Sequence, residues 1–424
     1  MIEQLNLNKK ILLLSSWAPP KIGGAQNLYN IFANINPDDY CILTSKQNLK
    51  GKEGKFGTKL ECDYFFYDEE TKNFIIDPEL PKKRYYYFIK KFSFIFKAIK
   101  NLASLLKFLL VSLSLINKII KQGKEITKNK KIDLIIGLSD VEINLVSTLI
   151  LSKILKKPFA IYLFDLYYGN QLSFPYNAIA KFAEPIIFKT AKNIIVTNGA
   201  TKDYYLNKYG MEEKYTIIHN CVFPENYENI IPTTIKKTDD KISIVFTGNI
   251  YWPQETSLDN LLKLINNNQT ENIEISIYCP SPPTNLINKY QDNKKIKFTA
   301  AAQSDMPRIQ SEADILFLPL SWNTEAPDII RTASPGKLTD YLISGRPILI
   351  HAPKYSFIAK YGKENNFAEV VDEENIDKLK IAIDKLSNNH IYSKQLVLNA
   401  ASVFYRNHDA RTNAKKFTQI INNI

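Results

Sequence analysis

Cysteine and histidine are scarce in this chain. Its 424 residues include four of each. The cysteines, at positions 41, 62, 221 and 279, show no Cys-x-x-Cys spacing, so the sequence indicates neither a zinc ribbon nor a disulfide framework. The histidines are scattered, and no cluster of carboxylates and histidines is evident. We therefore expect no metal site and no bound cofactor.

Glycine and long apolar runs are also few. With 14 glycines, 20 prolines and 45% hydrophobic residues, the composition is that of a globular protein rather than a disordered one. The longest uncharged apolar run, residues 108–116, has nine residues, whereas a transmembrane helix needs about 20. The start of the chain is mildly polar and has no signal-peptide architecture, which predicts a cytoplasmic protein.

Acidic residues are scarce in one part of the chain only. Residues 1–200 contain 29 basic and 17 acidic side chains, whereas residues 201–424 contain 26 of each. The whole formal net charge of +12 therefore belongs to the first half. Within that half, residues 82–131 hold 14 basic residues and a single acid, Glu125. This asymmetry predicts an anionic partner for the N-terminal half.

Alternating strand and helix patterns run along the chain in two rounds, and the length suits two domains of about 200 residues. Residues 222–240, between the rounds, have little periodicity, as expected of a linker. A βαβ rhythm of this kind predicts doubly wound parallel sheets. The expected strands are 10–16, 40–44, 131–138, 159–164, 192–197, 215–219, 241–247, 274–279, 314–320 and 348–351. The expected helices are 25–34, 142–155, 177–190, 256–266, 306–312, 336–344 and 393–423.

The most informative segment is 334–351, which reads Ser-Pro-Gly-Lys-Leu-Thr-Asp-Tyr-Leu-Ile-Ser-Gly-Arg-Pro-Ile-Leu-Ile-His. Ser334 suits the N-cap of a short helix and Pro335 its first position. The free N–H groups at the helix start, together with Lys337, favour an anion. Asp340 lies on the same helix face and can accept hydrogen bonds from hydroxyls. A phosphate site beside a ribose site would bind a nucleotide; the alternative is an ordinary amphipathic helix between two strands.

This pattern resembles the Pro-x-Lys-x-x-(Glu/Asp)-Tyr-Leu-x-x-Gly-x-Pro segment of GT-B glycosyltransferases, and most closely that of bacterial family-four-like (glycosyl transferases group 1) enzymes, which use nucleotide sugars. The resemblance implies an α/β protein of two Rossmann-like, doubly wound domains that face each other across a cleft. The first domain would span 1–222, with a basic amphipathic insertion at 82–131. The second, 223–404, would bind the nucleotide sugar, and the C-terminal helix at about 405–424 would join the first domain.

In that family the lysine neutralises the diphosphate and the acid binds the ribose, roles that fall here to Lys337 and Asp340. Gly23 and Gly24 resemble a glycine loop that faces the cleft, although a plain tight turn is the alternative. The resemblance implies these donor-binding residues: Gly23, Gly24, Gly248, Asn249, Gln254, Thr332, Ser334, Gly336, Lys337 and Asp340.

The chain departs from the family pattern at two places. Asn249 and Gln254 stand where many relatives have arginine and lysine, as in a subset of bacterial relatives, which leaves Lys337 as the main phosphate cation. A surface strand–helix turn is the alternative for this loop. Thr332 replaces the first of two family glutamates and cannot act as an acid. The candidates to substitute for it, in an expected extended loop, are Glu325, Asp328 and Arg331.

On the acceptor side, Asp165 ends a strand of the first domain, where open α/β sheets bind ligands. It resembles the acid of a (His or Arg)-Asp pair, with Phe164 in place of the basic partner. The resemblance implies that Asp165 orients the acceptor or stabilises positive character on the sugar carbon; a turn cap is the alternative. The implied catalytic residues are thus Asp165 and Lys337. His219 and Asn220 resemble a Pro-Asn pair of structural role.

A basic stripe marks residues 84–121. At 100° per residue, six lysines fall within an arc of about 140°, and apolar residues fill the rest. Such a helix suits an anionic membrane surface, on which it would lie without crossing. The six are Lys90, Lys97, Lys100, Lys107, Lys118 and Lys121. A core helix with a solvated basic face is the alternative, and nucleic acid is disfavoured because no nucleic-acid-binding pattern accompanies the charge.

These features predict a glycosyltransferase that moves a sugar from a nucleotide diphosphate sugar to a hydroxyl of a membrane-linked or polysaccharide acceptor, in cell-surface glycan synthesis. The resemblance implies a retained anomeric configuration and leaving-group stabilisation without a metal. The enzyme would be cytoplasmic and peripheral at the inner face of the membrane. Two alternatives stay open: a catalytically inactive GT-B scaffold or partner subunit of a glycan assembly, and another GT-B nucleotide-sugar enzyme such as an epimerase.

Overall fold

The chain divides into two compact units. The computed structural model describes residues 4–20, 23–46, 58–68, 93–139, 143–170, 174–228, 241–267, 272–322 and 324–424. Unit 1 comprises Met1–Val196, Lys208–Thr216 and Thr418–Ile424, and unit 2 comprises Thr197–Asn207 and Ile217–Phe417. Residues 197–207 group with unit 2, where the Asn198 amide donates to the carbonyl of Thr332 at 2.9 Å.

Unit 1 is built on a seven-stranded sheet in the order β3-β2-β1-β4-β5-β6-β7, and every pairing with a described register is parallel. Most of its strands are buried along their whole length, as expected when helices cover both faces. The strands are β1 (Ile11–Leu14), β2 (Tyr40–Thr44), β3 (Asp63–Phe66), β4 (Leu134–Leu138), β5 (Phe159–Leu163), β6 (Asn193–Val196) and β7 (Tyr215–Ile217).

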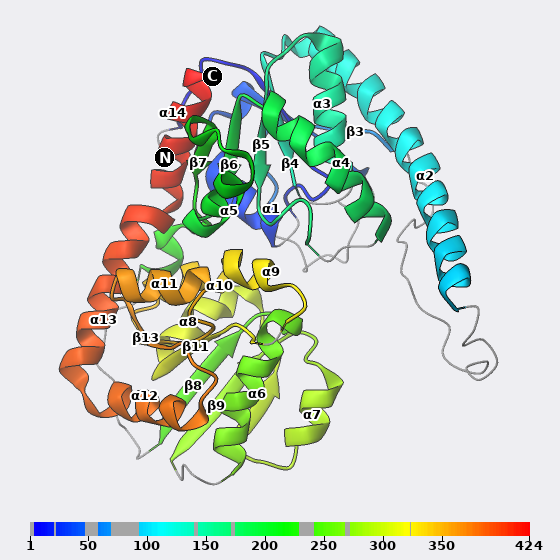
Figure 1. The fold of residues 1–424 in the computed structure, drawn as a ribbon. Helices are drawn as coiled ribbons and strands as arrows, with labels where there is room; N and C mark the ends of the chain where they lie inside the picture. Colours follow the sequence, from blue (N-terminus) through cyan, green and yellow to red (C-terminus); the bar gives the residue numbers. More distant parts are fainter. Residues whose placement is uncertain are drawn as a thin grey trace. The chain divides into compact units, whose positions relative to one another are not determined.

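The helices that follow these strands are α1 (Gly24–Phe32), α2 (Ser93–Lys130), α3 (Asn144–Leu155), α4 (Phe174–Thr190) and α5 (Gly199–Tyr209), with short 3₁₀ turns at Pro37–Asp39 and Glu212–Lys214. The long helix α2, cyan in Figure 1, contacts α3 and α4. Gly123 allows close approach, because a Cβ there would lie 2.5 Å from Cδ2 of Leu151 on α3. The first part of the predicted helix over 84–121 lies outside the described residues, and α2 continues beyond the predicted end to Lys130.

Unit 2 is built on a six-stranded parallel sheet in the order β10-β9-β8-β11-β12-β13. Alternate residues of β8 enter two separate cores: Ile244 and Phe246 enter one, and Val245 enters the other. The sheet is therefore covered on both faces, as the sequence rhythm predicted. The strands are β8 (Ile242–Thr247), β9 (Ile273–Tyr278), β10 (Ile296–Thr299), β11 (Ile315–Pro319), β12 (Ile348–His351) and β13 (Ala368–Val371).

The helices of unit 2 are mostly short. They are α6 (Trp252–Asn266), α7 (Thr284–Tyr290), α8 (Met306–Glu312), α9 (Pro327–Thr332), α10 (Lys337–Ile343), α11 (Phe357–Glu364), α12 (Ile376–Asn388), α13 (His390–Val403) and α14 (Ala410–Asn423), with the 3₁₀ turns η4 (Pro224–Tyr227) and η5 (Gln303–Asp305). The last residues of α14 belong to unit 1, where the carbonyl of Asn422 accepts from Nζ of Lys9 at 3.2 Å.

One local expectation was wrong: the expected extended loop around Asp328 and Arg331 is helix α9. The segment 393–423 is helical as predicted, but a π turn (Phe404–His408) interrupts it, and the Asp409 carboxylate then accepts from the Arg411 amide and the Thr412 hydroxyl. Within the expected linker, Pro224–Tyr227 forms η4, and residues 229–240 lie outside the described residues. Among the described residues, no helix has the length and apolarity that a membrane crossing requires.

Candidate functional site

Lys337 lies against the glycine loop that follows β8. Gly248 has φ +98°, and a Cβ there would lie 3.4 Å from Cε of Lys337. The Lys337 ammonium is 3.6 Å from the ring centroid of Phe246, and its Nζ is buried without a hydrogen-bond partner in the described structure. Burial lowers the pKa of Lys337 to about 7. An anion entering here would meet an amine whose donors are all available.

Asp340, one helical turn after Lys337, belongs to a chain of hydrogen bonds. The Tyr227 hydroxyl lies 2.9 Å from Oδ1 of Asp340 and 3.0 Å from Oε1 of Gln310. Nε2 of Gln310 then donates to the Thr247 hydroxyl at 3.1 Å. Burial raises the pKa of Asp340 to about 6, although the bond from Tyr227 opposes that rise. One face of α10 is thereby tied to the end of β8 through side chains from η4 and α8.

Three further hydrogen bonds fix α10 and the loop before it. The Tyr341 hydroxyl accepts from the backbone amide of Thr247 at 2.9 Å, which anchors the helix to β8. The Asn220 amide donates to the carbonyl of Ser334 at 3.0 Å, and the Thr339 hydroxyl donates to the carbonyl of Asn220 at 3.4 Å. The structural role predicted for Asn220 agrees with these contacts, since it holds the backbone on which Lys337 is mounted.

The predicted cap of this helix was wrong. Helix α10 begins at Lys337 with Gly336 as its N-cap, and no side chain caps it. The amides of Leu338 and Thr339 bond to the carbonyls of Pro335 and Gly336, so the chain enters the helix through tight i→i+3 turns rather than through a capping serine. Gly345, beyond the helix end, has φ +74°, the left-handed conformation in which glycine commonly ends a helix.

The other predicted donor residues of unit 2 have mixed surroundings. Asn249 is exposed in the loop after β8. Gln254 is buried in the first turn of α6, and its Oε1 has no hydrogen-bond partner within the described part of the chain. The Thr332 hydroxyl donates to the carbonyl of Asp328 at 2.8 Å, a bond within helix α9. Ser334 is half-buried and Gly336 is exposed. Among the predicted donor residues, the structure shows a contact between Gly248 and Lys337.

Two of the three candidate substitutes for the missing glutamate, Asp328 and Arg331, pair with each other on α9, whereas Glu325 is exposed before this helix. Nε of Arg331 lies 3.4 Å from Oδ1 of Asp328, three residues earlier on α9. The Arg331 guanidinium also lies 6.0 Å from the ring centroid of Tyr355. A cation and a carboxylate that pair within one helical turn partly neutralise each other's charge. Either residue is therefore a weaker substitute for the missing glutamate.

In unit 1, two predicted sites meet at one edge of the sheet. Gly23, with φ +82°, is the N-cap of α1 after β1, and a Cβ on Gly24 would lie 3.3 Å from Cδ2 of Phe164. Asp165 follows Phe164 directly beyond β5 and is exposed. The carboxyl ends of β1 and β5 therefore bring the glycine pair and the predicted acceptor acid close together.

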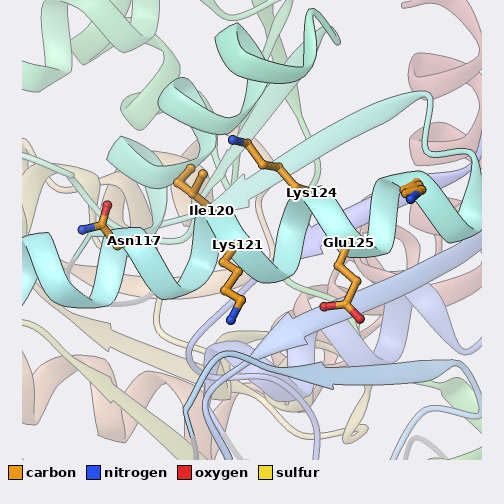
Figure 2. Close-up of a pocket in the computed structure, with 6 residues that line it drawn as sticks. Asn117, Ile120, Lys121, Lys124 and Glu125 are labelled. Carbon is orange, nitrogen blue, oxygen red and sulfur yellow. The ribbon is translucent and has the colours of Figure 1, made fainter.

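The lysines predicted to meet a membrane lie on or before α2. Lys107, Lys118 and Lys121 are exposed. Lys90 lies outside the described residues, and for Lys97 and Lys100 the structure describes the helical backbone only. Figure 2 shows a hollow lined by α2 alone, with Lys121 and Glu125 extending to one side and Lys124 to another. The residues that line it are Asn117, Ile120, Lys121, Lys124, Glu125 and Lys128.

Sequence reasoning missed Tyr227, Gln310 and Tyr341. Tyr227 stood in a segment interpreted as linker, although Pro224 begins it with a residue suited to a helical turn. Gln310 is a polar residue among the apolar positions of α8 and is buried. Tyr341 belongs to the motif itself but was assigned no role from the sequence. A buried polar side chain needs a partner, which is the signal that could have singled out Gln310.

No protein-family model and no curated protein matches the chain. Solved structures do match it in fold. HepE from Anabaena, in complex with UDP-glucose, is 14% identical, with 98% of this chain and 100% of that chain covered and a TM-score of 0.66. Sucrose-phosphate synthase from Thermosynechococcus elongatus is 12% identical over 97% of this chain and 98% of its own, with a TM-score of 0.65. UDP-GlcNAc 2-epimerase from Methanocaldococcus jannaschii is 13% identical, with 99% of this chain and 100% of that chain covered and a TM-score of 0.54.

These similarities show the fold of the chain. Each spans nearly the whole of both proteins, and the two parallel sheets of seven and six strands match the two-domain α/β architecture. The chain has the GT-B fold, as the sequence predicted.

Proposed function

We propose that the chain is a glycosyltransferase that uses a nucleotide diphosphate sugar. The observation that carries the proposal is the Lys337 amine, which is buried against a glycine loop without a hydrogen-bond partner among the described residues and lies three residues before a carboxylate. A diphosphate would provide the missing anion, and Asp340 would accept hydrogen bonds from the ribose hydroxyls. That HepE is titled as a complex with UDP-glucose supports a nucleotide sugar as the donor.

In the proposed reaction the acceptor oxygen forms a bond to the sugar carbon as the bond between that carbon and the diphosphate oxygen breaks; the nucleoside diphosphate leaves with the negative charge, and the hydroxyl proton is released. Lys337 and the backbone at Gly336 and Gly248 would stabilise that charge. The anomeric configuration would be retained. Among the described residues, no group of three or more acidic, histidine or cysteine side chains could hold a metal ion. We propose metal-independent transfer, which predicts unchanged turnover in EDTA; loss of activity that added metal restores would contradict it.

Asp165 is the proposed acceptor-side catalytic residue. Its position beyond β5, beside the glycine pair, supports a role in orienting the acceptor hydroxyl or in stabilising positive character on the sugar carbon. We propose a membrane-linked or polysaccharide acceptor in cell-surface glycan synthesis, with the enzyme cytoplasmic and peripheral at the membrane.

The test is direct titration of the full chain with a panel of nucleotide diphosphate sugars, beginning with UDP-glucose, followed by an assay for released nucleoside diphosphate. Binding with release on addition of an acceptor extract would support a transferase. Binding without release would favour the inactive scaffold. A similar fold in UDP-GlcNAc 2-epimerase favours the epimerase as the second candidate, and an altered sugar without any transfer would identify it.

A further inference from the structure

Helix α2 carries an exposed row of leucines. Leu102, Leu106, Leu110 and Leu113 are 57%, 55%, 69% and 56% exposed. Their spacing places them within an arc of about 80°, and they extend about 16 Å along the helix axis. Single exposed apolar residues are ordinary, whereas a contiguous apolar row on a surface marks an interaction site. We call these four residues the leucine row.

The leucine row is not the face by which α2 packs on unit 1. The buried residues of α2 are Ser112, Ile119, Ile120, Gly123 and Ile126, and Gly123 adjoins Leu151 of α3. At 100° per residue, the centre of the arc that they span lies about 100° around the helix from the centre of the row, and Ile120, at the near edge of that arc, is two turns beyond the last leucine of the row. The fold therefore already satisfies one face of α2 and leaves a second apolar face exposed.

Lysines flank the leucine row and continue it. The sequence of α2 contains eight lysines and one acid, Glu125. Lys107 is exposed beside the row, at an angle of about 60° or more from most of its members. Beyond Leu113 the same outer face becomes basic. Its exposed lysines are Lys121, Lys124 and Lys128.

We propose that this outer face of α2 docks on an anionic lipid bilayer, with the leucine row at the boundary between headgroups and acyl chains and the lysines against lipid phosphates. Apolar and basic residues arranged in this way are typical of helices that lie in a membrane interface. The proposal rests on the proposed function, because it would hold the transferase beside a lipid-linked acceptor. It also identifies the inserting residues, which the lysine pattern alone did not.

Charge decides between a bilayer and a second copy of the chain. Two copies of α2 packed through this face would bring their lysines together, and like charges oppose that contact. An anionic bilayer reverses the sign of the interaction, since each lysine near it is attracted. Nucleic acid would satisfy the lysines but would leave the leucine row in water.

The test is co-sedimentation of the full chain with vesicles of phosphatidylglycerol and phosphatidylcholine in equal parts, and with phosphatidylcholine alone. We expect binding to the anionic vesicles, weaker binding to the neutral ones, and partial release by high salt. The double variant Leu106→Gln with Leu110→Gln should lower the vesicle partition coefficient about tenfold or more. The loss should include the binding that persists at high salt. Lys121→Gln with Lys124→Gln and Lys128→Gln should remove the part that salt releases.

Matched controls lie on unit 2. Ile391, 86% exposed on α13, provides Ile391→Gln as the apolar control, and Lys360, Lys394 and Lys415 provide a triple Gln control. All variants should bind nucleotide like the parent. Absence of parent binding to anionic vesicles at low salt, or equal effects of the control variants, would overturn the proposal. A concentration-dependent dimer that only the leucine variants abolish would assign the row to a second copy. Vesicle binding without any nucleotide binding would remove the proposed function and leave this inference standing.

Discussion

The two units share a parallel α/β architecture but place their charged groups differently. In unit 2, the groups proposed to bind the donor are partly buried and held by neighbours: Lys337 lies against Phe246 and Gly248, and Asp340 is bonded to Tyr227. In unit 1, Lys107, Lys118, Lys121, Lys124 and Lys128 of α2 are exposed, and Asp165 is an exposed residue. Buried groups in fixed positions suit the recognition of one small ligand, whereas exposed groups suit a broad surface or a variable acceptor.

The two units also differ in their histidine content. All four histidines belong to unit 2, so unit 1 has no side chain that ordinarily titrates near pH 6.5. His408 is fully buried; its Nδ1 lies 2.7 Å from the carbonyl of Asn220, and its Nε2 lies 3.1 Å from the Tyr361 hydroxyl. Burial lowers the pKa of His408 to about 4. The ring of His219 lies 5.0 Å from that of His408, and burial lowers its pKa as well.

The largest expected effect is acid destabilisation confined to unit 2. Because the folded pKa of His408 lies below the unfolded value of about 6.5, its contribution is present above pH 6.5 and is lost as the pH falls toward 4. The loss between pH 7 and 4.5 should be roughly 2–3 kcal/mol from His408 alone. Hydrogen exchange should show amides of unit 2 losing protection in this range before those of unit 1.

The matched variants are His408→Gln and His390→Gln, since His390 is exposed on α13. A glutamine at 408 can keep hydrogen bonds to both neighbours but does not titrate, so the pH dependence should flatten. The variant at 390 should follow the parent. If unit 1 loses protection first on acidification, the assignment of acid sensitivity to the buried imidazoles is wrong.

The second prediction concerns the diphosphate. Lys337→Ala should weaken nucleoside diphosphate binding by about 1.5–3 kcal/mol, the range for hydrogen bonds to charged groups. It should not lower the free energy of unfolding, because burial disfavours the charged amine that is removed. Lys394→Ala, at an exposed site, is the control for calorimetry and for urea unfolding. Parent-like binding by the Lys337 variant would place the diphosphate elsewhere.

Binding should also take up protons at Lys337. Its pKa is about 7 in the free protein, and a bound diphosphate would raise it. Affinity should therefore decline as the pH rises above 7, where the free amine is increasingly neutral. Titrations in two buffers of different ionisation enthalpy measure the uptake, and Lys337→Ala should abolish it.

A third, smaller effect is expected at Asp340. Tyr227→Phe removes the hydroxyl that bonds to the carboxylate, which should cost about 1 kcal/mol of nucleoside binding. Because that bond opposes the rise in the pKa of Asp340, the pH above which the nucleoside binds well should move upward from about 6. Calorimetry with a nucleoside across pH 5–8 gives both values. Tyr405→Phe, at an exposed tyrosine, should change neither.

Much of the fold could be predicted because its central strands are apolar runs flanked by helical patterns. The segments 40–44, 306–312 and 348–351 have the predicted bounds. The motif around Lys337 and Asp340 could be recognised because its spacing fixes residues on one helix. Tyr227 could not be found in this way, since it bonds across 113 residues to Asp340 from a segment without periodicity. The exact start of α10 and the break in the helix before Asp409 could not be predicted, because hydrogen bonds local to those turns replace an ordinary side-chain cap.

The smallest expected effect on donor affinity belongs to unit 1, at Asp165. This residue follows β5 of unit 1, whereas Lys337 and Asp340 belong to unit 2. Asp165→Asn keeps the size of the side chain and removes its charge, so nucleoside diphosphate affinity should stay within about twofold of the parent. Turnover should fall by about 10²-fold or more if the carboxylate takes part in proton transfer or charge stabilisation. Asp203→Asn, on the exposed side of α5, is the control. An equal loss of donor affinity and turnover would mean that Asp165 contacts the donor or supports the fold, and the division of roles between the units would then fail.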